Sequence, residues 1–266
     1  LGKDGPEKAL KVINVEDLSG KDKQYFYQEI LTLSSISNTF IVSLFSYSDV
    51  CPFCIATDFS KCGTLYDAIL HKPRAPRLDN TQKTIIAMGI AYGMISVHEH
   101  HFIHRDLKSA NILLDENYLP KISDFGLSIK TDENMIIEQN AVGTAAWMAP
   151  EMFDGTKHIT NKADVYSFGI ILWEMLTETI PFKNKDPINI MTLVVVNKER
   201  PRFPSYAPRN LKSLIERCWD ENPDNRPSFV DIYNMFLHKE VYYSQTNLYK
   251  IDAMGEYISK KTAGKL

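Results

Sequence analysis

The run of eight residues at positions 104–111 is the feature that most constrains what this chain can fold into. It reads His104-Arg105-Asp106-Leu107-Lys108-Ser109-Ala110-Asn111, and thirteen residues after it comes Asp124-Phe125-Gly126. Asp106 is a candidate general base and Lys108 brings a positive charge two residues later. Asn111 and Asp124 supply hard oxygen donors, which suit Mg²⁺. This pattern predicts two neighbouring loops that together carry a general base, a positively charged side chain and two metal ligands.

The distribution of apolar residues predicts strands first and helices later. Strands are expected at 7–15, 40–46 and 53–59, and helices at 22–35, 82–99, 162–177, 211–219 and 228–238, with Thr64 capping a helix that begins at Leu65. This order is typical of an α+β protein with a small sheet lobe and a large helical lobe. Residues 239–266 show no clear periodicity and are expected to form a tail or linker.

The motifs resemble those of eukaryotic protein kinases, in order and at matching spacing over nearly all of residues 7–238. The resemblance implies a two-lobed kinase domain over 1–238, with an N-lobe at 1–58 and a C-lobe at 59–238. It also implies ATP and Mg²⁺ (or Mn²⁺) as cofactors and proteins as substrates. Asp106 would then accept the proton of the substrate hydroxyl, Lys108 would neutralise charge on the transferred group, and Asn111 and Asp124 would bind the metal.

Further roles follow from the same resemblance. Lys11 would contact the ATP phosphates while paired with Glu29, Thr57 would guard the back of the adenine pocket, and the hinge and remaining ATP contacts would be Asp58, Phe59, Ser60, Ala9 and Leu113. Structural or regulatory roles would fall to Arg105, Phe125, Gly126, Ser128, Thr131, Thr144, Glu151, Asp164 and Arg226, with Glu151 pairing with Arg226 and Asp164 receiving backbone N–H groups of the catalytic loop.

The loop residues also indicate the acceptor. Lys108 followed by Ser109-Ala110, together with Thr144, resembles serine/threonine-type loops, and Trp147 to Glu151 resembles the tyrosine-kinase-like group that includes Raf and the mixed-lineage kinases. Dual specificity remains an alternative. Ala110 stands where strongly basophilic kinases often carry Glu, which argues against selection for an arginine upstream of the target residue.

Regulation is expected in the segment between Gly126 and Gly143, where the only hydroxyls are Ser128 and Thr131. Arg105 precedes the base and would hold a phosphorylated segment through charge-assisted bonds. We expect Thr131 to be the target of an upstream kinase. The alternative is that Asp132, Glu133 or Glu138 supplies the negative charge.

One kinase motif is missing. The glycine-rich loop should precede Lys11 by about fifteen residues, but only ten residues stand there, and Leu1-Gly2-Lys3 is either the start of a lost loop or part of a turn. We therefore expect two of the usual five strands to be absent, weak ATP affinity and low stability. A pseudokinase or scaffold that binds partners through this fold remains an alternative; a small-molecule kinase is disfavoured by the complete peptide-binding loop.

Composition excludes other classes. The net charge of −3 gives no electrostatic attraction to nucleic acid, and no apolar run is long enough to span a membrane. We therefore expect a cytoplasmic protein. Tethering to a membrane by domains outside this segment remains an alternative. Cys51-x-x-Cys54 lacks a second pair, and the histidines at 98, 100 and 101 lack the spacing of a zinc helix. We expect reduced thiols and solvated imidazoles. Oligomeric state is not predicted.

Overall fold

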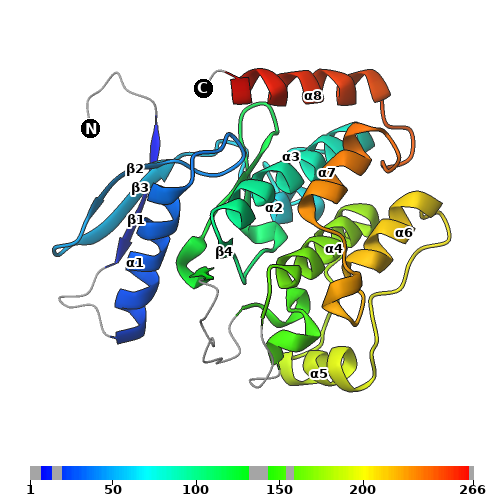
Figure 1. Ribbon diagram of the computed structural model, residues 1–266, viewed down its shortest axis with the longest axis horizontal. Coiled ribbons are helices and arrows are strands. Elements are labelled where there is room, and N and C mark those ends of the chain that lie inside the picture. The colour runs from blue at the N-terminus through cyan, green and yellow to red at the C-terminus, as the bar shows by residue number, and fades with distance from the viewer. Residues whose placement is uncertain (1–6, 14–19, 132–142, 154–158, 264–266) are drawn as a thin grey trace.

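The computed structural model describes residues 7–13, 20–131, 143–153 and 159–263. Within them, a small antiparallel sheet and one helix lie on one side, and a larger group of helices lies on the other (Figure 1). The sheet has the order β1-β3-β2, formed by β1 (Lys8–Ile13), β2 (Leu44–Ser48) and β3 (Phe53–Asp58). This arrangement confirms the predicted α+β fold with a small sheet half and a large helical half.

Helix α1 (Gly20–Ser35) covers one face of this sheet. Phe26 and Ile30 lie four residues apart on one helix face and pack against Ile55 of β3. Burying each of these apolar side chains stabilises the fold by about 1.5–3 kcal/mol. Glu29 is buried on the same side of α1, so the helix that packs on the sheet also carries a carboxylate toward β1.

Two long helices form the centre of the large half. Helix α3 (Asn80–Glu99) begins with a reciprocal capping pair between Asp79 and Gln82. Helix α4 (Lys162–Thr177) is buried on all sides from residue 163 to 175, as its apolar sequence predicted. The surrounding helices are α2 (Leu65–Ile69), α5 (Pro187–Met191), α6 (Arg209–Cys218) and α7 (Phe229–Leu237).

Two two-stranded ladders border the catalytic segments. Strand β4 (Phe102–Ile103) pairs with β7 (Ile129–Lys130), and β5 (Ile112–Leu114) pairs with β6 (Pro120–Ile122). The 104–111 run therefore joins β4 to β5, and Asp124-Phe125-Gly126 follows β6. Each loop is anchored at both ends by backbone pairing.

The predicted strand at 40–46 is wrong in its first half. Phe40, Ile41 and Val42 are buried, but they pair with Ile122 of β6 instead of joining the sheet. The strand itself begins at Leu44. An apolar run reads alike in both positions, so the sequence pattern did not show that this connection attaches the small half to the large half.

The C-terminal segment also differs from the expectation. The absence of regular structure predicted after residue 238 is wrong, because Leu248–Ala263 forms helix α8, which lies along α3 and α7 (Figure 1). Ile251, Met254 and Ile258 are buried in the large core. Tyr243 precedes α8 and donates a 2.9 Å hydrogen bond from its hydroxyl to the carbonyl of Leu172 in α4.

Candidate active site

Asp164, at the start of α4, fixes the backbone of the 104–111 loop. Its carboxylate accepts the N–H groups of His104 and Arg105 at 2.9 and 3.0 Å, and lies 2.9 Å from Nε2 of His98. Burial alone would raise the pKa of Asp164, but the His98 hydrogen bond and the charges and N–H groups around it lower the pKa below its ordinary value. The carboxylate therefore stays ionised in the core, where it holds Arg105 in a left-handed conformation with φ 65°.

His98 corrects the expectation of solvated imidazoles. Its side chain is only 11% exposed and its ring also contacts Phe229 edge-on. His98 is thus part of the support of the loop, whereas His100 and His101 are exposed as predicted.

Asp106 lies in a closed set of hydrogen bonds. Nζ of Lys108 is 2.6 Å from Oδ2 of Asp106 and 2.7 Å from the hydroxyl of Thr144, and that hydroxyl donates to Oδ1 of Asp106 at 2.8 Å. The amide of Asn111 adds a 3.1 Å bond to Oδ2. Residues from the 104–111 loop and from the 143–151 segment thus orient one largely buried carboxylate.

The donor set of Asn111 and Asp124 fits a divalent cation. The Asn111 amide nitrogen donates to the backbone and the carboxylate of Asp106, which leaves its carbonyl oxygen free of that contact. The Asp124 side chain is 49% exposed, and its backbone has φ 64°. An amide oxygen and an accessible carboxylate are ligands that Mg²⁺ accepts together with phosphate oxygens and water.

Lys11 connects the small half to Asp124. Its Nζ lies 2.7 Å from Oε2 of Glu29 and 3.6 Å from Oδ1 of Asp124. Burial would lower the pKa of Lys11, but Glu29 and Asp124 raise it above its ordinary value. Burial raises the pKa of Glu29, although Lys11 opposes this. Beside these residues lies a pocket of about 240 Å³ that Tyr25, Phe26 and Leu127 also line.

The predicted hinge residues lie at and directly after the end of β3, whose last residue is Asp58. Thr57 pairs across the sheet with Ala9, and Leu113 is half-buried opposite Thr64. Phe59 and Ser60 form the connection to the large half. Within the part of the chain that the structure describes, their side chains make no hydrogen bond. The structure thus places Ala9 and Thr57 beside each other in the sheet, whereas Leu113 lies in β5 of the large half.

The side chain of Asp58 has a contact set that the sequence did not indicate. Its carboxylate lies 3.2 Å from Nζ of Lys8 in β1 and 3.2 Å from Nζ of Lys121 in β6, and it accepts the N–H of Ser43 at 3.1 Å. Burial would raise the pKa of Asp58, and the Ser43 N–H and the two lysines lower it overall.

The 143–151 segment is positioned by buried contacts. Gly143 has φ 125° and lies so close to the carbonyl of Arg105 that a Cβ would approach it to 2.9 Å. The indole N–H of Trp147 donates to Glu174 at 2.8 Å, and Ser109 donates to the same carboxyl at 2.9 Å. Burial raises the pKa of Glu174 to about 8 against the effect of these donors.

Glu174 was missed in the sequence, where it is a lone carboxylate in an apolar helix. A charged residue at the centre of a fully buried helix needs hydrogen-bond partners, and this was the available signal. Its two partners connect the 104–111 loop to the 143–151 segment.

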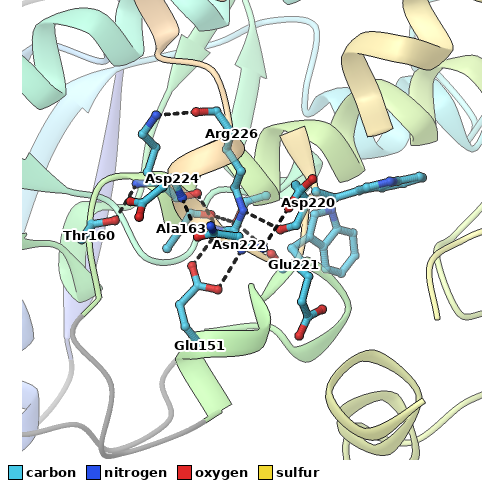
Figure 2. Close-up of polar contacts among 12 residues, drawn as sticks. Glu151, Thr160, Ala163, Asp220, Glu221, Asn222, Asp224 and Arg226 are labelled. Carbon is cyan, nitrogen blue, oxygen red and sulfur yellow. Dashed lines mark hydrogen bonds and ion pairs between the residues drawn. The ribbon is translucent and has the colours of Figure 1, made fainter. Parts of the chain in front are cut away.

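Glu151 and Arg226 lie together as predicted (Figure 2). The guanidinium also donates to the carbonyls of Asp220 and Lys162 at 2.9 and 3.0 Å, and lies 5.3 Å from the ring centre of Tyr166. This buried pair ties the end of the 143–151 segment to the start of α4.

The segment after Asp124 contacts α1. Phe125 and Gly126 are buried, and Phe125 packs against the ring of His104. The Ser128 hydroxyl donates to the carbonyl of Phe125 at 2.7 Å and also lies 2.7 Å from the Thr32 hydroxyl.

The expected regulatory residues are not in contact with each other. Arg105 donates through Nε to the carbonyl of Leu127 at 2.6 Å, and burial lowers the pKa of its guanidinium. Thr131 donates its hydroxyl to the carbonyl of His101 at 3.1 Å. Asp132, Glu133 and Glu138, like Leu1 to Lys3, lie outside the described residues.

Comparison with known proteins matches this sequence to one family. The model of the family described as protein tyrosine and serine/threonine kinase matches residues 3–236. A probable serine/threonine-protein kinase of Dictyostelium discoideum is 37% identical over 240 residues, which are 86% of this chain and 17% of that relative.

Two proteins of Arabidopsis thaliana are similar over nearly the same part of the chain. The serine/threonine-protein kinase STY17 is 33% identical over 86% of this chain and 40% of its own length. The serine/threonine/tyrosine-protein kinase HT1 is 37% identical over 84% of this chain and 58% of its own length. The chain therefore spans between about a sixth and three fifths of the length of these relatives.

Proposed function

Because this chain belongs to the protein tyrosine and serine/threonine kinase family, we propose that it transfers the γ-phosphate of ATP to serine and threonine hydroxyls of proteins. The family that the sequence motifs predicted is confirmed, and it uses ATP and a divalent metal. The specific metal, the acceptor residue and the roles of individual side chains are our proposal.

The observation that carries the proposal is the set of bonds around Asp106. Lys108 contacts one carboxylate oxygen of Asp106 and Thr144 the other. These two contacts fix the orientation of the carboxylate, so that it stays in place when an acceptor hydroxyl approaches. In the reaction the acceptor oxygen forms a bond to the γ-phosphorus, the bond from that phosphorus to the β,γ-bridging oxygen breaks, and the hydroxyl proton passes to Asp106. Lys108 is placed beside Asp106, where its charge offsets the negative charge of the transferred group.

ATP would lie between the hinge and Asp124. The backbone of Asp58 to Ser60 would bind adenine, with Ala9, Thr57 and Leu113 around the base, and Lys11 would bind the α- and β-phosphates while Glu29 holds its ammonium. Mg²⁺ bound by Asn111 and Asp124 would neutralise charge on the phosphates. These side chains act by positioning and charge, which is the main contribution that a protein makes to phosphoryl transfer.

Serine and threonine are the favoured acceptors for two reasons. Thr144 contacts both Asp106 and Lys108, as in the serine/threonine-type loops that the sequence resembles. Two of the relatives above are named serine/threonine-protein kinases, and the third is named for tyrosine as well, so dual specificity is the alternative.

Phosphate transfer to a generic serine/threonine protein substrate tests the proposal. Asp106→Asn should abolish transfer while the protein still unfolds cooperatively, whereas Asp49→Asn, an exposed carboxylate in the β2–β3 turn, should leave it unchanged. An inactive wild type that still binds partners would favour a scaffold. Transfer confined to tyrosine would refute the acceptor assignment.

We propose that Thr131 is the regulatory site that an upstream kinase modifies. Phosphorylation would first require that the Thr131 hydroxyl lose its hydrogen bond to the carbonyl of His101. The phosphate would then form a charge-assisted hydrogen bond with a cation such as Arg105. Mass spectrometry of the active enzyme should find Thr131 phosphorylated, and an unmodified active form would contradict this.

As to membranes, none of the helices in the described part of the chain combines the length and the apolar character that a membrane span needs.

A further inference from the structure

A second pocket, separate from the residues assigned above to catalysis and to ATP, lies around helix α2. It has a volume of about 350 Å³ and is bounded by the turn before α2 and the loop after it. Lys61, Lys72 and Arg74 line it, together with one carboxylate, Asp67. The pocket wall therefore carries an excess of positive charge, although the chain as a whole has a net charge of −3.

The one carboxylate in the pocket is already neutralised. Asp67 binds Nζ of Lys72 at 2.7 Å through one oxygen and accepts the Thr64 hydroxyl at 2.8 Å through the other. The hydrogen bond from Lys72 is the largest of the effects that lower the pKa of Asp67. Asp67 is thus engaged by Thr64 before α2 and Lys72 after it, and is no counter-ion for the remaining two cations.

Lys61 and Arg74 are the cations that remain available. Lys61 approaches Glu7 only to 3.8 Å, and both side chains are more than half exposed, so this contact is weak. Arg74 has no hydrogen-bond or ion-pair partner among the residues that the structure describes. Its backbone is held in the left-handed region with φ 68°, a conformation that costs energy in a residue other than glycine.

The position of α2 connects this pocket to the catalytic loop. Helix α2 packs against the turn Ser109–Asn111, and Cys62 and Gly63 exchange backbone hydrogen bonds with Leu114 in the strand that follows. Through these contacts the pocket lies beside the segment that carries Asp106, on the side where α2 packs against residues 109–111. Residues that flank an acceptor hydroxyl at Asp106 are the part of a protein substrate that would meet it.

We propose that this pocket binds an anionic side chain of the protein substrate, a glutamate, an aspartate or a phosphorylated residue, in the segment that flanks the acceptor. The inference rests on the proposed kinase function and adds a substrate class to it. It agrees with Ala110 in the catalytic loop, where the carboxylate that strongly basophilic kinases often carry is absent. Lys61 and Arg74 act as specificity-determining residues.

Peptide phosphorylation by the full chain tests this inference. The substrates share one serine and carry glutamates, phosphoserine, glutamines or arginines in the residues that flank it on either side. We expect kcat/KM for a glutamate or phosphoserine peptide to exceed that of the glutamine peptide by about threefold to tenfold, mainly through KM, and to fall with salt. The ratio between the glutamate and phosphoserine peptides identifies which anion the pocket prefers.

Variants of the pocket give the decisive comparison. Arg74→Gln and Lys61→Gln should remove the preference while keeping the rate on the glutamine peptide, and Arg74→Glu should shift it toward the arginine peptide. Arg77→Gln, an exposed arginine in the same loop but outside the pocket lining, is the matched control and should keep the preference. An equal preference in wild type, Arg74→Gln and Lys61→Gln would overturn the proposal.

A binding measurement separates this proposal from the kinase function. Fluorescence anisotropy of labelled glutamate and glutamine peptides should show tighter binding of the former, lost in Arg74→Gln. If no peptide is phosphorylated, the proposed function fails, but the anisotropy ratio still decides whether the pocket selects anions.

Discussion

The hydroxyl of Thr32 lies 2.7 Å from the hydroxyl of Ser128, although 96 residues separate them and both are buried. Thr32 belongs to α1, the helix that carries Glu29, and Ser128 follows Asp124-Phe125-Gly126. The contact therefore joins two parts of the site: the helix whose Glu29 pairs with Lys11, and the segment that contains the metal-ligand candidate Asp124.

Breaking this contact should uncouple α1 from the Asp124 segment. Thr32→Val preserves shape but leaves Ser128 with the carbonyl of Phe125 as its remaining partner, so we expect a loss of about 1–2 kcal/mol in the free energy of unfolding and a lower kcat. Urea denaturation and steady-state kinetics measure the two effects. Ser34→Ala, on the exposed face of α1, is the control; equal behaviour of both variants would refute the coupling.

The pair formed by Glu151 and Arg226 should be the most destabilising to break. Arg226 is 1% exposed, so Glu151→Gln leaves a buried cation without its counter-charge, and we expect a loss of about 3–5 kcal/mol. Arg226→Lys should also destabilise, because an ammonium cannot donate two parallel hydrogen bonds. Urea titrations should show a far smaller loss, below about 1 kcal/mol, for Glu221→Gln, whose half-exposed carboxylate pairs with Arg200.

Glu174 should make stability depend on pH. The pKa of its carboxyl is about 8 in the folded protein, against an ordinary value of 4.5. Below about pH 4.5 both states hold the proton; between there and about pH 8 the unfolded state releases it while the folded state keeps it. The free energy of unfolding therefore falls as pH rises through this window, by ~1.4 kcal/mol for each pH unit at most.

Glu174→Gln should remove this slope, because an amide has no proton to lose and can still accept from Trp147. Denaturation at pH 5, 6, 7 and 8 should show the wild type losing stability relative to the variant as pH rises. Glu216→Gln, on the exposed face of α6, should follow the wild type. Parallel curves for wild type and Glu174→Gln would show that the carboxyl does not titrate in this range.

Helix α8 should contribute to the stability of the large half. Ile258 is 3% exposed, and Ile258→Asp places a charge in the core, so we expect α8 to detach and the free energy of unfolding to fall by several kcal/mol. Hydrogen exchange should increase along α8 and the facing side of α3. Lys250→Asp, on the exposed side of α8, should change little. Unaltered exchange in Ile258→Asp would mean that α8 does not pack as described.

Residues close together in the sequence were easier to predict than contacts between distant elements. Asp106, Lys108 and Asn111 lie within six residues, so their motif indicated a shared loop, and the pairing of Lys11 with Glu29 followed from a familiar pattern. The contacts of Thr32 with Ser128, and of Glu174 with Ser109 and Trp147, depend on how whole helices pack, and no local pattern encodes that. Helix α8 did have a signal, because Ile251, Met254 and Ile258 recur at helical spacing.

The three contacts of Asp58 have a consequence for motion between the two halves of the molecule. Its carboxylate touches Lys8 on the sheet and Lys121 on the large half at equal distances of 3.2 Å, directly beside the connection about which the halves would rotate. A rotation of one half relative to the other must lengthen one of these contacts or carry both lysines along. One side chain, in a residue whose backbone is also proposed to bind adenine, therefore adds to the mechanical stiffness of the connection between the halves.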